Sequence, residues 1–387
     1  MNWSSFLTSI RNKWRPHEST IVGIDIGTTK IAAAVVNFDS GYPKILGIAC
    51  VPFNGVNWAD SNKIAITTAA ISDVLGIVRK KPGGLARTAV VGISGMSSGK
   101  NSIGAVRIKR QILREDAQRA VNAAADMKVP EDSVIVEHVV NSFSLDGIEG
   151  IENPLDITYS SLEALTHTII CKRSVLEIVS ASCKQAGLNA RQVKVSEIAA
   201  TSLLLTQEDK KHGVCLLDIG GEYTSLLVFV SGALQYSASV PWGGNYLTNC
   251  IGLGLGLNKA DAELAKIDFS TNGAANITED RFKAIRELLD ERLRELSILI
   301  NCELDKKELK DALGAGLVLT GGTSNLPGLA EIFEHELALP VRHAEFENVT
   351  WLENVSLGYA SAIGLAVAEN SDVVGFRVKE NAHVRSH

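Results

Sequence analysis

The sequence has no long hydrophobic run, no paired cysteines and no excess of positive charge, and each absence removes a class of protein. No stretch approaches the roughly 20 apolar residues that cross a bilayer, and the first residues lack the apolar segment and cleavage site of a signal peptide. The six cysteines are scattered, without a C-x-x-C pair or the spacing of a zinc site, which is typical of a reduced, cytosolic protein. A net charge of −6 gives nucleic acid no global attraction, so no nucleic-acid partner is expected.

The composition is that of a folded chain whose pattern alternates strands with helices. Hydrophobic residues make up 45% and charged residues 21% of the 387 positions, which is enough for several structural units. Apolar runs with strand character and an amphipathic helical period open the chain, so an α/β protein is expected. The predicted strands lie near 21–26, 31–37, 45–51 and 88–94, and the predicted helix lies near 61–80.

The middle of the chain has a different pattern. From Gly104 to about His167, short strands around a helix at 114–127 predict a compact inserted subdomain. A helix over 172–188 follows and ends at Gly187, a residue typical of helix C-termini. The second half then restarts the pattern of the first, which indicates an internal repeat. Its predicted elements are strands within 213–240 and 315–322, helices at 259–267 and 279–309, and an apolar segment at 356–369.

Two stretches repeat one motif. "IDIGTTKIAAAVV" (24–36) and "LDIGGEYTSLLVF" (217–229) each consist of a strand, an aspartate, a glycine turn and a second strand. Glycine lets backbone N–H groups approach phosphate oxygens, and the carboxylate can hold a hydrated cation. A plain β-hairpin explains either copy alone. Two copies, together with "LTGGTSNLPGL" (319–329), favour one anionic ligand between two similar loops.

These motifs resemble those of the actin-like ATPase superfamily, and within it the chain resembles the FtsA family of bacterial cell division. The segment at 195–203 corresponds to the superfamily's connecting motif, and "VVGISGMSSGKNSIGAVRI" (90–108) and "PWGGNYLTNCIGLGLGLNKADAELAKI" (241–267) carry the family likeness, which covers about 20–368. The resemblance implies an α/β, actin-like (ribonuclease H-like duplicated) two-lobe fold with a nucleotide cleft and an FtsA-type inserted subdomain. PilM-type pilus proteins share much of this plan and are the nearest rival.

The resemblance also implies a division of the chain. The inserted FtsA-type subdomain is expected at 85–167, and the small helical subdomain of the second lobe at 258–314. An amphipathic helix is expected at 1–18 and a polar tail at 370–387. The first lobe is then made of 19–84, 168–212 and 355–369, and the core of the second lobe of 213–257 and 315–354.

ATP and Mg²⁺ are the implied ligands. By the resemblance, Asp25 and Asp218 orient waters on Mg²⁺, and Lys30 reaches a phosphate oxygen or faces solvent. Glu197 lies where relatives place a residue that positions the attacking water, although it can also cap the following helix. The residues around the phosphates are Gly27, Thr28, Thr29, Gly220 and Gly221. Glu263 and Lys266 are expected to contact the ribose and adenine, although they can also be a plain surface ion pair. Gly321 and Gly322 are expected to let the backbone lie against the base.

The second loop departs from the superfamily's usual D-I-G-G-G-T. Glu222 and Tyr223 replace the third glycine and the threonine, which puts a carboxylate and a bulky ring where the terminal phosphate is expected. A negative charge beside phosphate weakens binding unless a cation or a turned-away side chain relieves it. We therefore expect ATP to be bound and to be hydrolysed slowly at most.

The N-terminus has an amphipathic pattern. Its apolar residues fall within an arc of roughly 100° on a helix, with arginines and hydroxyl residues opposite and Pro16 at the end. This pattern indicates a helix that binds anionic lipid, or one that docks on protein. FtsA proteins typically carry such a helix at the C-terminus, whereas this chain ends in the polar "GFRVKENAHVRSH". The expected membrane residues are Trp3, Phe6, Leu7, Ile10 and Trp14.

The resemblance implies an adaptor that binds ATP, forms actin-like filaments on the cytoplasmic face of the membrane at the division site, and tethers the C-terminal tail of the tubulin-like protein FtsZ. Candidates for contact with that acidic tail are Lys283, Arg286, Arg292 and Arg294, which also fit an ordinary solvated helix face. Two alternatives stay open. One is a PilM-like inner-membrane adaptor of pilus assembly, and the other is a small-molecule kinase on the same fold, which would need a carboxylate base near the γ-phosphate.

Overall fold

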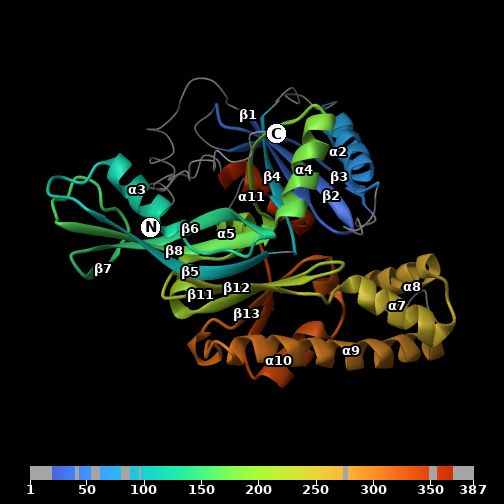
Figure 1. Ribbon diagram of the computed structural model, residues 1–387. Coiled ribbons are helices and arrows are strands. Elements are labelled where there is room, and N and C mark those ends of the chain that lie inside the picture. Colours follow the sequence, from blue (N-terminus) through green and yellow to red (C-terminus); the bar gives the residue numbers. More distant parts are fainter. Residues whose placement is uncertain are drawn as a thin grey trace.

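The computed structural model describes residues 20–39, 43–53, 62–79, 88–95, 97–272, 278–347 and 355–368. Within them, two five-stranded sheets with their helices form two lobes, and a third sheet of four strands extends to one side (Figure 1). The predicted membrane helix at 1–18 and the predicted tail at 370–387 lie outside the described residues, so both stay predictions.

The first sheet has the strand order β3-β2-β1-β4-β9. β1 pairs antiparallel with β2, which pairs antiparallel with β3, whereas β4 runs parallel to β1 and β9 parallel to β4. Side chains from both faces of β1 are buried, which explains its continuous apolar run. The elements are β1 (Thr20–Ile26), β2 (Lys30–Asn37), β3 (Lys44–Pro52), β4 (Thr88–Ile93) and β9 (Asn189–Val195), covered by α2 (Lys63–Arg79) and α4 (Arg173–Gln185).

The second sheet repeats this topology in the order β12-β11-β10-β13-β14. Again an antiparallel meander of three strands is extended by two parallel ones. The predicted internal repeat and the duplicated ribonuclease H-like fold are thereby confirmed. The strands are β10 (Val214–Ile219), β11 (Thr224–Val230), β12 (Ala233–Val240), β13 (Leu317–Thr320) and β14 (Val341–His343).

Two helices between the sheets join the lobes. α5 (Ser196–Leu204) and α11 (Ala360–Ala368) share one buried cluster with side chains of both sheets. A side chain on Gly23 of β1 would overlap the carbonyl oxygen of Ala362, and one on Gly364 would overlap that of Ala199. These glycines therefore let α11 lie directly on β1 and α5, which fixes the sheets relative to each other.

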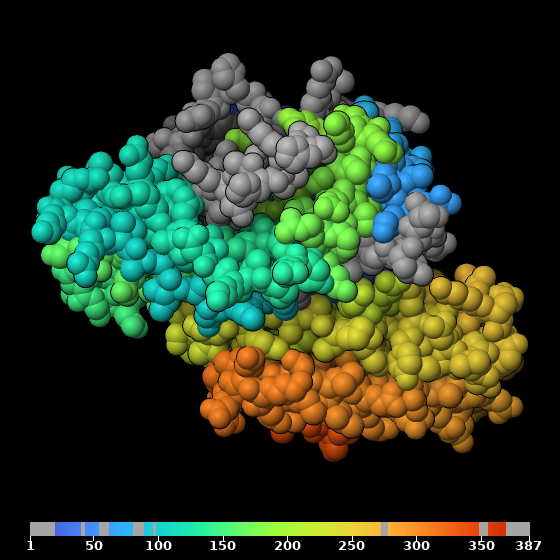
Figure 2. Space-filling view, viewed as in Figure 1, coloured from blue at the N-terminus to red at the C-terminus, as the bar shows by residue number. Residues whose placement is uncertain are grey.

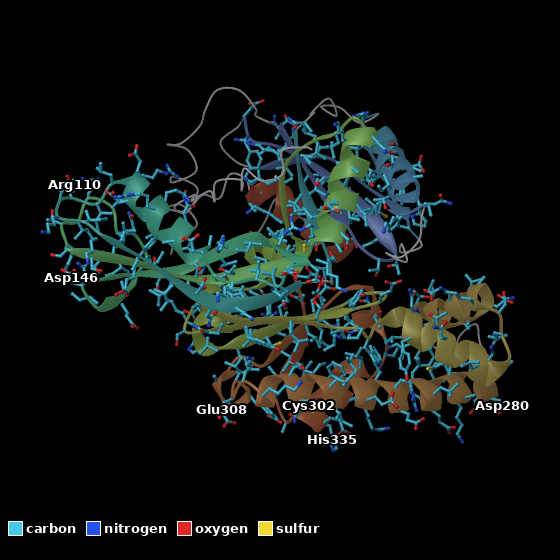
Figure 3. The ribbon with its side chains drawn as sticks, viewed as in Figure 1. Arg110, Asp146, Asp280, Cys302, Glu308 and His335 are labelled. Carbon is cyan, nitrogen blue, oxygen red and sulfur yellow. The ribbon has the colours of Figure 1, made fainter. Side chains whose placement is uncertain are left out.

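The outer side of the second lobe is helical. The long helix α9 runs along it, and Figure 3 labels Asp280 near its start and Glu308 just beyond its end. Its buried residues pack on the second sheet together with those of its neighbours. The helices are α6 (Gln207–His212), α7 (Gly244–Leu255), α8 (Lys259–Asn272), α9 (Glu279–Asp305) and α10 (Leu329–Leu337), with short 3₁₀ turns at Lys310–Ala312, Gly322–Asn325 and Leu357–Tyr359.

The inserted sheet has the order β5-β8-β6-β7, with α3 (Arg114–Ala124) packed on it. Its strands are β5 (Ser97–Arg107), β6 (Ser133–Leu145), β7 (Ile148–Ile151) and β8 (Ser161–Lys172). Three of them have 11 to 13 residues, so the prediction of short strands was wrong. Their polar residues resembled loop signals, but hydroxyl groups pair across the strands instead: Ser102 Oγ lies 2.8 Å from Oγ1 of both Thr166 and Thr168.

The inserted sheet touches both lobes, and in Figure 2 it protrudes on the left above the strands of the second lobe. On the first lobe, Lys194 of β9 donates to Glu137 of β6 at 3.1 Å. On the second lobe, the Asn141 side chain exchanges two hydrogen bonds of 2.9 and 3.0 Å with the Leu234 backbone. Both contacts are polar, which is typical of interfaces between parts that move relative to each other.

Candidate functional site

The two glycine loops predicted from the sequence have the same turn. In the β1–β2 connection, Gly27 N donates to Lys30 O at 3.1 Å, and in the β10–β11 connection Gly220 N donates to Tyr223 O at 2.9 Å. A Cβ atom at either glycine would approach that carbonyl oxygen to 3.0 or 3.1 Å. The sequence repeat therefore corresponds to a repeat of backbone geometry at the ends of equivalent strands.

The two loops also touch each other. Glu222 N donates to Thr28 Oγ1 at 3.2 Å, across a sequence separation of 194 residues. A side chain on Gly221 would overlap the methyl group of Thr29, so this glycine lets the second loop come close to the first. The structure thus brings together the residues that the sequence assigns to the phosphates.

Asp25, at the end of β1, is buried and accepts two hydroxyl hydrogen bonds. Ser196 Oγ donates at 2.6 Å and Ser94 Oγ at 3.0 Å, both to the same carboxylate oxygen. Burial raises the pKa of Asp25, while the hydrogen bond from Ser196 and the charge of Lys30 act in the opposite direction. The carboxylate is thereby held in place at the strand end, where ligands of α/β sheets bind.

Glu197, in the first turn of α5, is only 3% exposed. Its Oε1 accepts from Gly95 N at 2.8 Å and from Ser225 Oγ at 2.9 Å, groups that both lie outside the helix. Its Oε2 is buried and has no hydrogen-bond partner among the described residues. Burial, and next the charge of Asp218, raise the pKa of Glu197 to about 8.

Asp218, at the end of β10, completes a group of three acidic side chains. Burial and the charge of Asp25 raise its pKa to about 6, with the charge of Lys30 opposing. A cation at this point would relieve the repulsion, and oxygen donors are those that Mg²⁺ prefers. No three His, Cys, Asp or Glu groups within the described ranges are arranged to ligate one metal ion directly. The carboxylate oxygens of Asp25 and Asp218 are of the type that accept hydrogen bonds from the waters of a hydrated Mg²⁺.

Lys30 lies beside these carboxylates. Its Nζ donates to the carbonyl oxygen of Gly358, just before α11, at 2.7 Å. Its positive charge opposes the rise that burial causes in the pKa of Asp25 and Asp218. The side chain thus connects the first loop with the C-terminal part of the first lobe.

Glu263 and Lys266 form an ion pair of 2.7 Å on α8, but it is not a plain surface pair. The Lys266 side chain is buried, and its amine also donates to Gly244 O at 2.9 Å and to Thr248 Oγ1 at 2.8 Å. Burial lowers the pKa of Lys266. Because Gly244 N donates to Gly220 O at 2.9 Å, the pair is tied to the second phosphate loop.

Gly321 and Gly322 have different surroundings. Gly321 has a φ of 88°, and a side chain there would overlap a carboxylate oxygen of Asp218. Its lack of a side chain therefore serves the close approach of β13 to the acidic group. Gly322 is exposed, and a Cβ atom there would meet no protein atom within 4 Å. Only Gly322 therefore borders the open space that a base needs.

The two residues that depart from the superfamily pattern are partly buried. Burial raises the pKa of Glu222, while the charge of Lys259 at the start of α8 lowers it. The Tyr223 ring lies against Gly95, at the end of β4. The second loop is thus in contact with the first lobe through its tyrosine as well as through Glu222 N.

Several supporting groups were not predicted from the sequence. Those that hold the carboxylates are Ser94, Gly95, Ser196 and Ser225, and Thr323 donates through its hydroxyl to Gly220 O at 3.0 Å. A signal was available for two of them. Ser94 follows β4, the parallel neighbour of β1, and Ser225 stands opposite Asp218 in the β10–β11 register. Hydroxyl residues at the same sheet edge as a predicted ligand are therefore candidates for positioning it.

Three of the four basic residues expected to meet an acidic tail have partners within the second lobe. Arg286 donates to Pro327 O at 2.9 Å, Arg292 pairs with Glu295 at 2.6 Å, and Arg294 with Glu336 at 3.5 Å. They lie on α9, which Figure 1 shows along the outer edge of the second lobe. Their charges are thus partly balanced.

Comparison with known proteins identifies the family. The cell division protein FtsA of Pseudomonas aeruginosa is 30% identical over 366 residues, covering 89% of this chain and 88% of that protein. The chain belongs to the FtsA family. Its residues 215–364 match the family model for cell division protein FtsA, and residues 95–170 match the SHS2 domain inserted in FtsA. The FtsA of Escherichia coli K12 is 26% identical over 373 residues and 89% of each chain.

Solved structures confirm the actin-like fold. The PilM-PilN type IV pilus biogenesis complex matches with a TM-score of 0.66 at 19% identity, covering 91% of this chain and 99% of that one. MreB5 of Spiroplasma citri bound to ADP matches with a TM-score of 0.53 at 13% identity, covering 93% of this chain and 100% of that one.

Within the described residues of this FtsA-family chain, no helix is both long and apolar enough to span a membrane.

The raised pKa of Glu197 predicts a pH dependence of stability. Between pH 4.5 and about 8, the Glu197 carboxyl group keeps its proton in the folded protein and loses it in the unfolded chain. The proton on Glu197 therefore stabilises the folded state at low pH, and this stabilisation is lost as pH rises through that range. In metal-free buffer, we expect Glu197→Gln to reduce the fall of the unfolding free energy between pH 5 and 8 by up to about 1.4 kcal/mol per pH unit. Urea unfolding at several pH values measures the slope, with the exposed Glu149→Gln as control. Equal slopes for wild type and Glu197→Gln would contradict the prediction.

Proposed function

We propose that this FtsA-family chain binds ATP with Mg²⁺ between the Gly27–Lys30 and Gly220–Tyr223 loops and acts as a nucleotide-dependent adaptor in cell division. In this role it polymerises on the cytoplasmic face of the membrane at the division site and tethers the C-terminal tail of the tubulin-like protein FtsZ. The observation that carries the proposal is the contact between Thr28 and the Glu222 backbone. Two equivalent glycine turns that meet beside buried carboxylates are suited to one polyphosphate. We also propose that the chain is divided into two lobes, an inserted subdomain and a small helical subdomain, with the bounds expected from the sequence.

Each part of the site has a role in binding. The backbone N–H groups of the two turns surround the phosphates, and Lys30 adds a positive charge beside Asp25 and Asp218. Mg²⁺ would neutralise phosphate charge, with its waters oriented by Asp25 and Asp218. The MreB5 structures, which contain ADP and AMPPNP, support nucleotide as the ligand of this fold.

On the adenosine side, Glu263 faces the ribose, and Lys266 holds the Glu263 side chain in position. The three N–H donors of Lys266 are taken by Gly244, Thr248 and Glu263, so the amine acts on the ligand by holding Glu263. Gly322, which borders open space, lies against the base, and Gly321 keeps β13 close to Asp218.

Hydrolysis is expected to be slow. Oε1 of Glu197 already accepts hydrogen bonds from Gly95 N and Ser225 Oγ, and burial raises the pKa of this carboxyl group, which disfavours the charged form. Glu197 is the residue placed to position the attacking water, and its burial limits it as a base. ATP then serves mainly to fix the conformation that self-associates.

Gly322 provides a test of the nucleotide site, because a side chain there meets no protein atom. We expect Gly322→Val to keep the unfolding midpoint of the wild type and to lower the affinity for Mg²⁺–ATP about tenfold, since the added side chain contacts the base. Isothermal titration calorimetry measures the affinity. Gly76→Ala, at a similarly open position on α2, is the matched control and should bind as wild type does. Absence of Mg²⁺–ATP binding by the wild type would refute the proposed function.

The membrane role of residues 1–18 predicts lipid binding. The full chain should sediment with vesicles that contain anionic lipid and much less with neutral vesicles, because basic residues flank the apolar face. Removal of residues 1–18 should abolish sedimentation, and their fusion to green fluorescent protein should restore it. If the shortened chain sediments as before, residues 1–18 are not the membrane anchor.

The division partner can be distinguished from a pilus partner by affinity purification. A tagged chain expressed in its own cells should recover a tubulin-like GTPase, and recovery should decrease when an excess of the GTPase's C-terminal tail peptide is added. Exclusive recovery of pilus-assembly components would favour the PilM-like alternative. An untagged strain provides the background.

A further inference from the structure

The segment Ser94–Gly95 connects the nucleotide site to the inserted sheet. It follows β4 of the first sheet and leads to Ser97, where β5 begins. Ser94 donates through its hydroxyl to Asp25, and Gly95 donates through its backbone N–H to Glu197. The first strand of the inserted sheet is thus attached beside two of the three acidic side chains of the site.

The Tyr223 ring holds this segment from the other side. Gly95 has a φ of 71°, and a Cβ atom there would lie 2.7 Å from Tyr223 Cβ and 3.1 Å from the ring atoms Cγ and Cδ2. The Cβ atom and the near ring atoms of Tyr223 therefore occupy the space beside Gly95, which has no room for a side chain. Because Tyr223 O closes the second phosphate turn through Gly220 N, a displacement of that turn moves the ring as well.

The far side of the inserted sheet can respond to such a displacement. β5 and β8 contact β12 through polar pairs: Asn101 donates to Gln235 at 3.0 Å, and His167 Nε2 lies 2.9 Å from Ser237 Oγ. The Asn101–Gln235 hydrogen bond is exposed and can be exchanged for water at small cost, whereas the His167–Ser237 pair is buried and would have to shift as a unit. In Figure 1 these strands of the inserted sheet lie next to β12.

We propose that Tyr223 is a positioning residue that couples the occupant of the terminal-phosphate position to the orientation of the inserted sheet, acting through Gly95. The proposal rests on the proposed nucleotide binding. A terminal phosphate that displaces the Gly220–Tyr223 turn shifts the ring, the ring shifts Gly95, and β5 moves relative to β12. By linkage, a partner that prefers one orientation of the inserted sheet changes the relative affinity for ATP and ADP by the same factor. A threonine at position 223, as in the usual superfamily motif, lacks the ring that reaches Gly95.

Hydrogen exchange of the full chain tests the coupling. At saturating Mg²⁺–ATP and Mg²⁺–ADP, the amides of Ser97–Arg107 and Ala233–Val240 should differ in exchange rate by about fivefold or more in the wild type. Tyr223→Phe, which keeps the ring, should retain the difference. Tyr223→Thr should lose it while still binding both nucleotides. Tyr246→Ala, which removes a tyrosine ring from α7, is the control and should behave as wild type.

The outcomes separate this coupling from the function on which it rests. Equal exchange with ATP and ADP in a wild type that binds both overturns the coupling and leaves nucleotide binding intact. A difference that persists in a folded Tyr223→Thr also overturns it. Calorimetry without binding in the wild type rejects the proposed function instead. Equal exchange in the wild type overturns the coupling even if a variant fails to fold, because that comparison needs no substitution.

Discussion

The gathering of Asp25, Asp218 and Glu197 at one point between two sheets is the constraint on which the site depends. Like charges withdrawn from water raise each other's pKa values, and no arginine pairs with them among the described residues. The protein stabilises the arrangement with short-range dipoles, namely hydroxyl groups and the Gly95 N–H, and with Lys30 nearby. A cation bound at this point would reduce the repulsion, in line with the proposed Mg²⁺–ATP site.

Duplication makes this arrangement possible. Each half of the chain contributes one aspartate at the end of its first strand and one glycine turn after it, and the helices α5 and α11 hold the two copies face to face. The acidic residue from α5 then completes the group from a third direction. The inserted sheet enters the fold at the neighbouring strand end, so its attachment point and the ligand site share the same few residues.

Much of this could be predicted from the sequence, because it depends on local pattern. The strands, the long helices, the paired aspartate and glycine turns and the family likeness are all written in contiguous residues. The supporting contacts were not predictable in that way. The position of Ser94 next to Asp25 depends on the parallel pairing of β4 with β1. The contact of Gly95 with Glu197 depends on a positive φ, which the presence of a glycine does not by itself predict. The burial of Lys266 depends on how α8 packs on α7. The lengths of the strands in the inserted sheet were underestimated, because serine and threonine residues are also typical of loops.

The position of α11 has a consequence for the assembly of the molecule. This helix comes near the end of the chain, yet it fills the space between β1, the first strand described, and α5. Domains generally begin to fold from the N-terminus during synthesis. Here the face of the first sheet that packs on α5 and α11 stays partly uncovered until α11 has been synthesised. A product truncated before Ala360 would expose that surface, which makes it a substrate for chaperones and proteases.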